Sequence, residues 1–389
     1  MNPPLRYVIT SDSQSQVQAN LLTWTDLKGT RYYRPLNALA NLNNTRVLVE
    51  RHRDRGIGDI LFTTGPLAYL QNTNSQTIQI FYYANTDRSH VLHGNPALHN
   101  EMPMSGPVIY DTLPLYHYHW FIESATEYDE EPEQQNVYDA LYRQIGIDPE
   151  KVAPEFKRPV LKAYKADKQR VDDFFRILFY ERHEDWRKSP YWVVAPISTS
   201  SLRSAPYAMW LKVIEELAKT RHVVVVGQVI NGLIPTTDMD FAQFQEHLGQ
   251  MASHNKNVVN LLGRTPMRLT TGLIASAEGL ITLDSGLLYV AQGLRVPAVS
   301  IWGPQNPSTR IGYDPDYMNL AVWEYRTCDW APCFAYRKFP EHKCPRGAKQ
   351  QVCEPLRAAT PEAVMAKVEL VWSRKPGIIA PIIAGTPKK

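Results

Sequence analysis

Short apolar runs recur along the chain and alternate with stretches in which apolar residues repeat at helical spacing. The runs, rich in β-branched and aromatic residues as buried strands are, stand at 46–50, 76–84, 107–110, 191–195, 222–226, 258–264, 280–283 and 296–301. Helical spacing is found at 59–70, 137–145, 168–180, 209–218, 267–277 and 287–294. Strands that alternate with helices in this way form parallel, doubly wound sheets. The pattern occurs in 45–150 and again in 190–305, so we expect an α/β protein with two Rossmann-like domains.

The unit at 280–294 shows the pattern in its shortest form. A buried strand ends at Leu283, Asp284 and Ser285 break it, and a helix follows from Gly286. Such a turn places a carboxylate, a hydroxyl and free backbone N–H groups at a helix N-terminus, where α/β sheets bind phosphates and sugars. The alternative is an ordinary helix cap, because Asp and Ser are favoured N-cap residues.

A second strand–loop–helix unit begins at 46–50. Its loop is basic and contains Gly56 and Gly58, and Asp59 stands where the helix starts. The glycines let the backbone approach a ligand closely. Pro66 lies inside the helical pattern, so we expect the helix to kink or restart there.

Length and composition fit a two-domain globular protein of 389 residues with 44% hydrophobic and 21% charged residues. The net charge of +3 neither requires nor excludes a polyanionic partner. The first residues lack a basic-then-apolar pattern, and no apolar run approaches the length of a membrane span. We therefore expect a cytoplasmic protein, for which peripheral contact with the inner membrane face stays open.

The cysteines and two of the histidines are candidate metal ligands. The four cysteines Cys328, Cys333, Cys344 and Cys353 follow the spacing C-x4-C-x10-C-x8-C. This clustering fits a structural zinc site or a loop of buried free thiols, and the spacing is not that of a standard zinc ribbon. His117 and His119 would share one face of a strand, but no carboxylate or cysteine stands at ligand spacing, so we expect no catalytic metal there.

The ends of the chain differ from its middle. Residues 1–44 form an N-terminal extension with weak local structure, which serves either as a packing strap or as an acceptor-binding arm. Three prolines within 148–168 indicate a connection between the domains. Thr360 as N-cap and Pro361 at the first helical position predict a last helix over 361–373, followed by a Pro-rich tail, 374–389.

Five short motifs occur in an order that resembles glycosyltransferase family nine, the ADP-heptose:lipopolysaccharide heptosyltransferases and their relatives. They are 58–67 (GDILFTTGPL), 203–206 (RSAP) ahead of Trp210, 262–265 (LGRT), 284–287 (DSGL) and 302–304 (WGP) with Pro307. The resemblance implies a GT-B fold with two domains facing across a cleft. It implies an acceptor-side domain at 45–165, a nucleotide-sugar domain at 166–358 with the cysteine loop 328–353, and a helix at 359–373 that packs back on the first domain.

The resemblance also implies roles for individual residues. Asp59 matches the catalytic base, and the acceptor side would include Arg55, Gly58, His117 and His119. Donor binding would fall to Ser198, Thr199, Ser200, Arg203, Gln228, Asp284, Ser285, Gly286, Leu287 and Tyr289. Two positions depart from the family pattern: Tyr289 stands where a histidine is usual, and Gln228 lies in a segment that often has an acidic residue for the ribose.

These observations predict an inverting, metal-independent glycosyltransferase that requires no cofactor. Its donor would be a nucleotide-diphosphate sugar, and its default acceptor a saccharide or lipid-linked saccharide of the cell envelope, such as lipopolysaccharide core. One alternative acceptor is a hydroxylated base in DNA, because arginines hold phosphates and aromatic rings stack on bases. The other alternative is a non-catalytic nucleotide-binding protein of the same fold.

Overall fold

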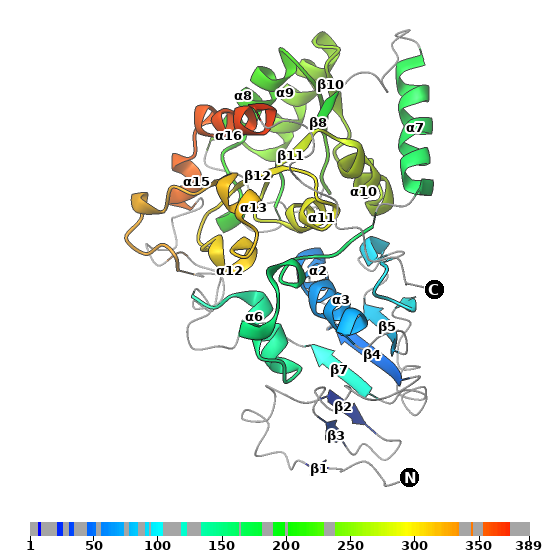
Figure 1. Cartoon of the computed structure of the whole chain (residues 1–389). Coiled ribbons are helices and arrows are strands. Elements are labelled where there is room, and N and C mark those ends of the chain that lie inside the picture. The colour runs from blue at the N-terminus through cyan, green and yellow to red at the C-terminus, as the bar shows by residue number, and fades with distance from the viewer. Residues whose placement is uncertain are drawn as a thin grey trace. The chain divides into compact units, whose positions relative to one another are not determined.

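A computed structural model describes the chain at 7–8, 22–25, 31–34, 45–51, 56–73, 78–84, 90–92, 95–103, 118–122, 134–162, 165–180, 190–198, 201–228, 238–333, 344 and 353–373. Its contacts divide the chain into two compact units (Figure 1). The first comprises Met1–Lys162 with Ser308–Asp314, and the second comprises Ala163–Pro307 with Pro315–Lys389. The sequence-based division at 165/166 did not anticipate that Ser308–Asp314 belongs to the first unit.

The first unit contains a four-stranded parallel sheet of β4 (Thr45–Arg51), β5 (Ile78–Ala84), β6 (Asn100–Pro103) and β7 (Tyr118–Ile122). The strands lie in the order β6-β5-β4-β7, so the order reverses between β4 and β7. The middle of β4 is completely buried. The predicted strand at 107–110 lies outside the described residues.

Helices of the first unit are α2 (Ile57–Phe62), α3 (Thr64–Thr73), α6 (Val137–Gln144) and α12 (Ser308–Ile311). The break expected near Pro66 is present, because α2 ends at Phe62 and α3 starts anew with the proline in its first turn. Gly65 allows α3 to approach the chain at 156–158, since a Cβ there would lie 2.3 Å from the carbonyl oxygen of Phe156. Single turns of 3₁₀-helix lie at His90–Leu92, Pro149–Lys151 and Pro154–Phe156.

The N-terminal extension has more structure than its sequence indicated. Strands β1 (Tyr7–Val8), β2 (Leu22–Thr25) and β3 (Arg31–Arg34) form an antiparallel sheet in the order β1-β3-β2. β2 also lies beside β7. The expectation of weak local structure is therefore wrong for these strands, because the pairing joins segments that show no periodicity on their own.

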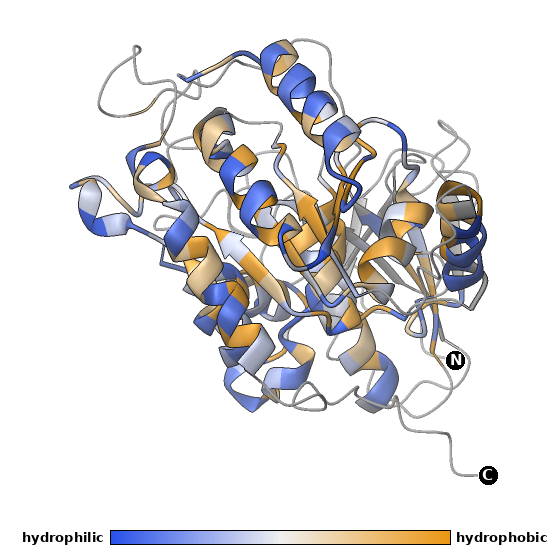
Figure 2. Cartoon of the chain, turned by 90° about the horizontal axis from the view of Figure 1, so that it is seen from above, coloured by the Kyte–Doolittle hydropathy of each residue, from blue (hydrophilic) through white to orange (hydrophobic). Residues whose placement is uncertain are grey.

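The second unit contains a six-stranded parallel sheet in the order β10-β9-β8-β11-β12-β13. Its strands are β8 (Tyr191–Ala195), β9 (His222–Val225), β10 (Val258–Asn260), β11 (Gly279–Leu283), β12 (Ala298–Ile301) and β13 (Ala321–Val322). Numbered within the unit, this is the 3-2-1-4-5-6 order of doubly wound nucleotide-binding sheets. Figure 2 shows the hydrophobic residues concentrated on the strands and on one side of the helices.

The helices of the second unit are α7 (Lys165–Tyr180), α8 (Tyr207–Ala218), α9 (Phe241–His254), α10 (Met267–Ser276), α11 (Gly286–Leu294), α13 (Pro315–Asn319), α15 (Glu354–Ala358) and α16 (Pro361–Ser373), with 3₁₀ turns at Ser201–Arg203 and Tyr325–Thr327. The pattern of apolar residues missed α9, which buries only Phe244 and Leu248. A capping box was the available signal: the Asp240 side chain accepts from the Gln243 N–H, and the Gln243 side chain accepts from the Asp240 N–H.

The last helix packs within the second unit. α16 packs on α8 and on strands β12 and β13. Its buried residues Val364 and Val368 belong to the core of the second unit, and the Trp372 ring meets Trp192 edge to face. The apolar face of this helix is thus taken up by the second unit, and the expectation that the helix packs back on the first domain stays a prediction.

Candidate functional site

The predicted donor residues gather at one edge of the second sheet. Strands β8 and β11 are neighbours and run parallel, with Ala195 beside Thr282, so their carboxyl ends lie together. The strand order reverses between these two strands, and ligands of open α/β sheets bind outside the carboxyl ends at such a reversal. Ser198 follows β8 and is buried, while Gln228 follows β9 and is exposed. Thr199 and Ser200 lie outside the described residues.

The turn after β11 is held firmly from both sides. The Asp284 N–H donates to the carbonyl oxygen of Ile301 at 3.2 Å, which ties the turn to β12. Ser285 precedes α11 in an extended conformation, and its side chain makes no cap hydrogen bond. Its hydroxyl lies 3.1 Å from that of Thr282 instead. Ser285 thus occupies the N-cap position of α11, but its side chain does not cap the helix.

Asp284 itself is nearly inaccessible, with 4% of its surface exposed. The Tyr289 hydroxyl donates to its Oδ1 atom at 2.6 Å. Its Oδ2 atom is buried and has no hydrogen-bond partner within the described parts of the chain. A carboxylate oxygen in such a position is costly unless a donor reaches it, which is typical of a ligand-binding group.

Arg203 lies beside the same turn. It ends the 3₁₀ turn that follows β8, and its Nη1 atom donates to the backbone carbonyl oxygen of Asp284 at 3.4 Å. The structure thus brings together Arg203, Asp284 and Tyr289, three of the residues that the sequence predicts to bind the donor substrate. Gly286 and Leu287 begin α11 and are half-buried. A guanidinium next to a helix N-terminus is suited to a diphosphate.

The predicted acceptor side lies in the first unit, at the carboxyl end of β4. Asp59 is half-buried in the first turn of α2, and its Oδ2 atom accepts from the Gly56 N–H at 3.0 Å. Gly58 precedes it within the same turn. The carboxylate therefore contributes to the start of the helix.

The remaining acceptor-side predictions fare differently. Arg55 and His117 lie outside the described residues. His119 is in register with Leu48, inside the sheet, whereas β4 continues to Arg51 before the loop that leads to α2. The backbone of His119 is therefore in the interior of the strand pairing and not at the edge where Asp59 stands.

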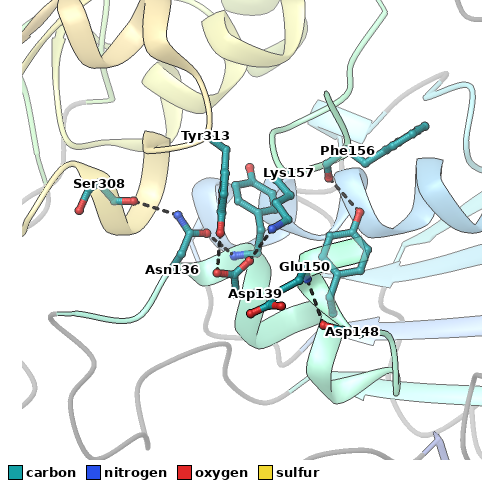
Figure 3. Close-up of polar contacts among 10 residues, drawn as sticks. Asn136, Asp139, Asp148, Glu150, Phe156, Lys157, Ser308 and Tyr313 are labelled. Atoms are coloured by element: carbon teal, nitrogen blue, oxygen red, sulfur yellow. Dashed lines mark hydrogen bonds and ion pairs between the residues drawn. The ribbon is translucent and has the colours of Figure 1, made fainter. Parts of the chain in front are cut away.

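Sequence reasoning missed a polar cluster in the first unit (Figure 3). Asp139 on α6 accepts from the Tyr313 hydroxyl at 2.7 Å and forms an ion pair with the Lys157 ammonium at 3.0 Å. The same ammonium lies over the Tyr313 ring. Burial, and then the hydrogen bond to Asp139, raise the pKa of Tyr313. Asn136 caps α6 and donates to the carbonyl oxygen of Ser308 at 2.9 Å. These contacts fasten Ser308–Asp314 to the first unit and join residues too far apart in sequence to be found by local patterns.

The cysteine loop shows no formed metal site in its described part. None of the four cysteines is in a disulfide, and Cys328 and Cys353 are buried. Burial, and then the neighbouring Cys333 thiol, raise the pKa of the Cys353 thiol. Among the described residues, no group of three or more histidine, cysteine or acidic side chains could hold a metal ion. The structural zinc interpretation therefore stays a prediction.

No helix in the described ranges combines the length and the apolar character needed to cross a bilayer. The prediction of peripheral membrane contact is not tested by this observation and stays a prediction.

Comparison with known proteins places the chain in a family context. The model of glycosyltransferase family 9, described as heptosyltransferase, matches residues 135–338, slightly more than half of the chain. Lipooligosaccharide heptosyltransferase 2 of Haemophilus ducreyi is 32% identical over 80 residues, 20% of this chain and 22% of that protein. The chain thus aligns with about a fifth of the length of this curated relative.

Solved structures are similar over a much larger part of the chain. Escherichia coli ADP-heptose lipopolysaccharide heptosyltransferase II superposes with a TM-score of 0.57 at 14% identity and covers 84% of this chain and 98% of its own. A family 9 glycosyltransferase of Veillonella parvula gives a TM-score of 0.59 at 14% identity, with 85% and 98% covered. At these identities the likeness shows the fold, and the predicted GT-B fold is confirmed.

Proposed function

Because the chain belongs to glycosyltransferase family 9, we propose that it transfers a sugar from a nucleotide-diphosphate sugar to an acceptor hydroxyl. The observation that carries the proposal is the turn at Asp284, which stands at the strand-order reversal of the second sheet with Arg203 beside it. ADP-heptose is the default donor, and a cell-envelope saccharide such as lipopolysaccharide core is the default acceptor.

The second unit would bind the leaving diphosphate without a metal ion. Negative charge grows on the diphosphate as the bond to the sugar breaks, and preorganised cations and N–H groups stabilise it most. Arg203 supplies a guanidinium, and the N-terminus of α11 supplies backbone N–H groups that have no partner within the helix. Ser198 would add a hydroxyl from the loop after β8.

The first unit would supply the base. Asp59 is half-buried, so an acceptor hydroxyl can reach it, and a carboxylate within hydrogen-bond distance can take the acceptor proton as the new bond forms. One base and one displacement invert the configuration at the anomeric carbon. The anomeric configuration of the product, read by nuclear magnetic resonance, tests this step, and retention would contradict it.

The identity of the nucleotide rests on fewer contacts. Gln228 is exposed just after β9, at the position where an acidic residue would reach a ribose. An amide can both donate to and accept from ribose hydroxyls, so this residue supports a nucleotide without selecting its base. The DNA acceptor stays a prediction, because residues 52–55 of the basic loop after β4 lie outside the described residues. Membership of a glycosyltransferase family supports an enzyme over the non-catalytic alternative.

A thermal-shift panel of nucleotide diphosphates and nucleotide sugars tests the proposal directly. A ligand at 100 times its Kd stabilises the folded protein by about 2.7 kcal/mol, a clear shift in melting temperature. We expect ADP-heptose to give the largest shift and inorganic phosphate none at equal concentration. If no nucleotide or nucleotide sugar shifts the melting temperature, the proposed donor site is wrong.

A further inference from the structure

We propose that Tyr289 is a positioning residue that holds one oxygen of Asp284, so that the other oxygen accepts from a hydroxyl of the transferred sugar. The inference rests on the proposed function, because it assigns the part of a nucleotide sugar that this carboxylate recognises. It concerns a contact within the second unit that composition and periodicity could not reveal.

The contact is short and buried on both sides. Tyr289 lies in α11 and is 3% exposed, against 4% for Asp284. A phenol that donates at 2.6 Å to a carboxylate makes a charge-assisted hydrogen bond of the stronger kind. Because the ring is packed in the core, the hydroxyl has little freedom, and Oδ1 is fixed in one place. The orientation of the whole carboxylate is thereby set.

The second carboxylate oxygen, Oδ2, indicates which kind of ligand group would donate a hydrogen bond to it. Oδ2 is buried and has no hydrogen-bond partner in the described ranges. A carboxylate oxygen accepts hydrogen bonds and repels the oxygens of a diphosphate, which are themselves acceptors with negative charge. The natural ligand group is a neutral hydroxyl. Asp284 therefore suits the sugar, while Arg203, which touches the backbone of the same turn, suits the diphosphate.

A purely structural role for Tyr289 makes a different prediction. If the phenol only satisfied a buried charge, its loss would lower stability and weaken every ligand of the turn equally. If it orients Asp284 toward the sugar, its loss weakens the nucleotide sugar and leaves the nucleotide diphosphate unchanged. The ratio of the two affinities separates these roles, and so does the comparison of ADP with 2′-deoxy-ADP, which isolates the ribose hydroxyl.

Tyr289→Phe is the test variant, because it removes only the hydroxyl. Tyr317→Phe is the matched control: Tyr317 is also buried, and its hydroxyl lies 2.5 Å from the carbonyl oxygen of Val296 and 2.9 Å from that of Ala291 on the same helix as Tyr289. Dissociation constants for ADP, 2′-deoxy-ADP and ADP-heptose are measured by calorimetry for both variants and for the unaltered protein. If Tyr289→Phe does not fold, Asp284→Asn is measured in its place and should show the same selectivity.

We expect Tyr289→Phe to weaken ADP-heptose about tenfold or more, the loss expected for one hydrogen bond to a charged group. ADP should stay within about twofold, and Tyr317→Phe should leave the ratio of the two affinities unchanged. Equal losses for ADP and ADP-heptose, or no loss for either, would overturn the inference while the proposed function stands. If Tyr289→Phe weakens the binding of ADP but not that of 2′-deoxy-ADP, Oδ2 accepts from the ribose hydroxyl, and the inference is overturned as well. Failure of the unaltered protein to bind any of the three would overturn the proposed function, and the inference with it.

Discussion

Asp284 and Asp59 are two carboxylates that follow a parallel strand and stand at the start of a helix, yet their surroundings differ. Asp284 comes directly after β11, is 4% exposed and is held by Tyr289. Asp59 lies beyond a longer loop, because β4 ends at Arg51 and α2 begins at Ile57. It is half-buried, and its carboxylate accepts from the Gly56 N–H.

The length of the connection explains the difference. A turn of two residues leaves no room between strand and helix, so the carboxylate is drawn into the edge of the sheet and needs a buried partner. A longer loop lets the helix start farther out, where the carboxylate stays accessible and completes the helix terminus. A donor site profits from the first arrangement, because rigid groups stabilise charge best, and a base profits from the second, because it must meet an acceptor.

Substitution of the accessible carboxylate should have the largest effect on turnover. Asp59→Asn keeps the helix start, because the amide oxygen of Asn can still accept from the Gly56 N–H, but it removes the base. We expect kcat to fall by about 10²–10⁴-fold, with melting temperature and ADP affinity near those of the unaltered protein. Steady-state kinetics with ADP-heptose and a saccharide acceptor measure it. Turnover at the original rate would reduce Asp59 to a cap and require another base.

Loss of the guanidinium beside the buried turn should have an intermediate effect. Arg203→Ala removes the charge proposed to face the diphosphate, and we expect ADP to bind about 1.5–3 kcal/mol more weakly, the range for hydrogen bonds between charged groups. Calorimetry measures the change. Arg326→Ala is the control, because it removes a guanidinium of the same unit that lies over the Tyr325 ring and, unlike that of Arg203, is exposed. Equal affinity in all three proteins would remove Arg203 from the site.

The smallest effect is expected for the contact that fastens Ser308–Asp314 to the first unit. Tyr313→Phe removes the hydrogen bond to Asp139 and leaves the ring beneath the Lys157 ammonium. Because Tyr313 is half-exposed, the free energy of unfolding should fall by only about 1 kcal/mol. Urea unfolding at neutral pH measures it, and a loss above about 3 kcal/mol would show that the hydroxyl does more than this one bond.

The same tyrosine gives a test by pH. Burial and the hydrogen bond to Asp139 raise the pKa of Tyr313 above its ordinary value of 10.0, so the folded state favours the neutral phenol. Its contribution to stability is complete below pH 10 and is lost as the pH rises through the raised pKa. In the second unit, burial raises the pKa of Tyr207 to about 12. Stability should therefore fall above pH 10, and less steeply in Tyr313→Phe; equal slopes in the two proteins would contradict this account.

Much of the fold could be predicted from local patterns. The apolar runs at 191–195 and 280–283 became β8 and β11, and Thr360 with Pro361 marked the start of α16, because burial and helix capping act on neighbouring residues. The position of Asp284 and Ser285 between a strand and a helix could be predicted for the same reason. Predictions failed where a segment had few apolar residues, as in α9, or where short strands acquire structure only by pairing, as in residues 1–44.

The sequence by itself determined which segments become strands and helices in most of the described chain, that two regions of the chain form parallel sheets, and which carboxylates stand at helix starts. Tertiary structure decided which unit each segment joins: the valines of α16 fit any apolar surface, and only packing placed them on α8. It also decided that Tyr313 meets Asp139, that His119 lies inside the sheet, and that Tyr289 fixes one oxygen of Asp284 and leaves the other buried. Periodicity records only the preference of each residue for burial, whereas these contacts depend on which buried surfaces meet.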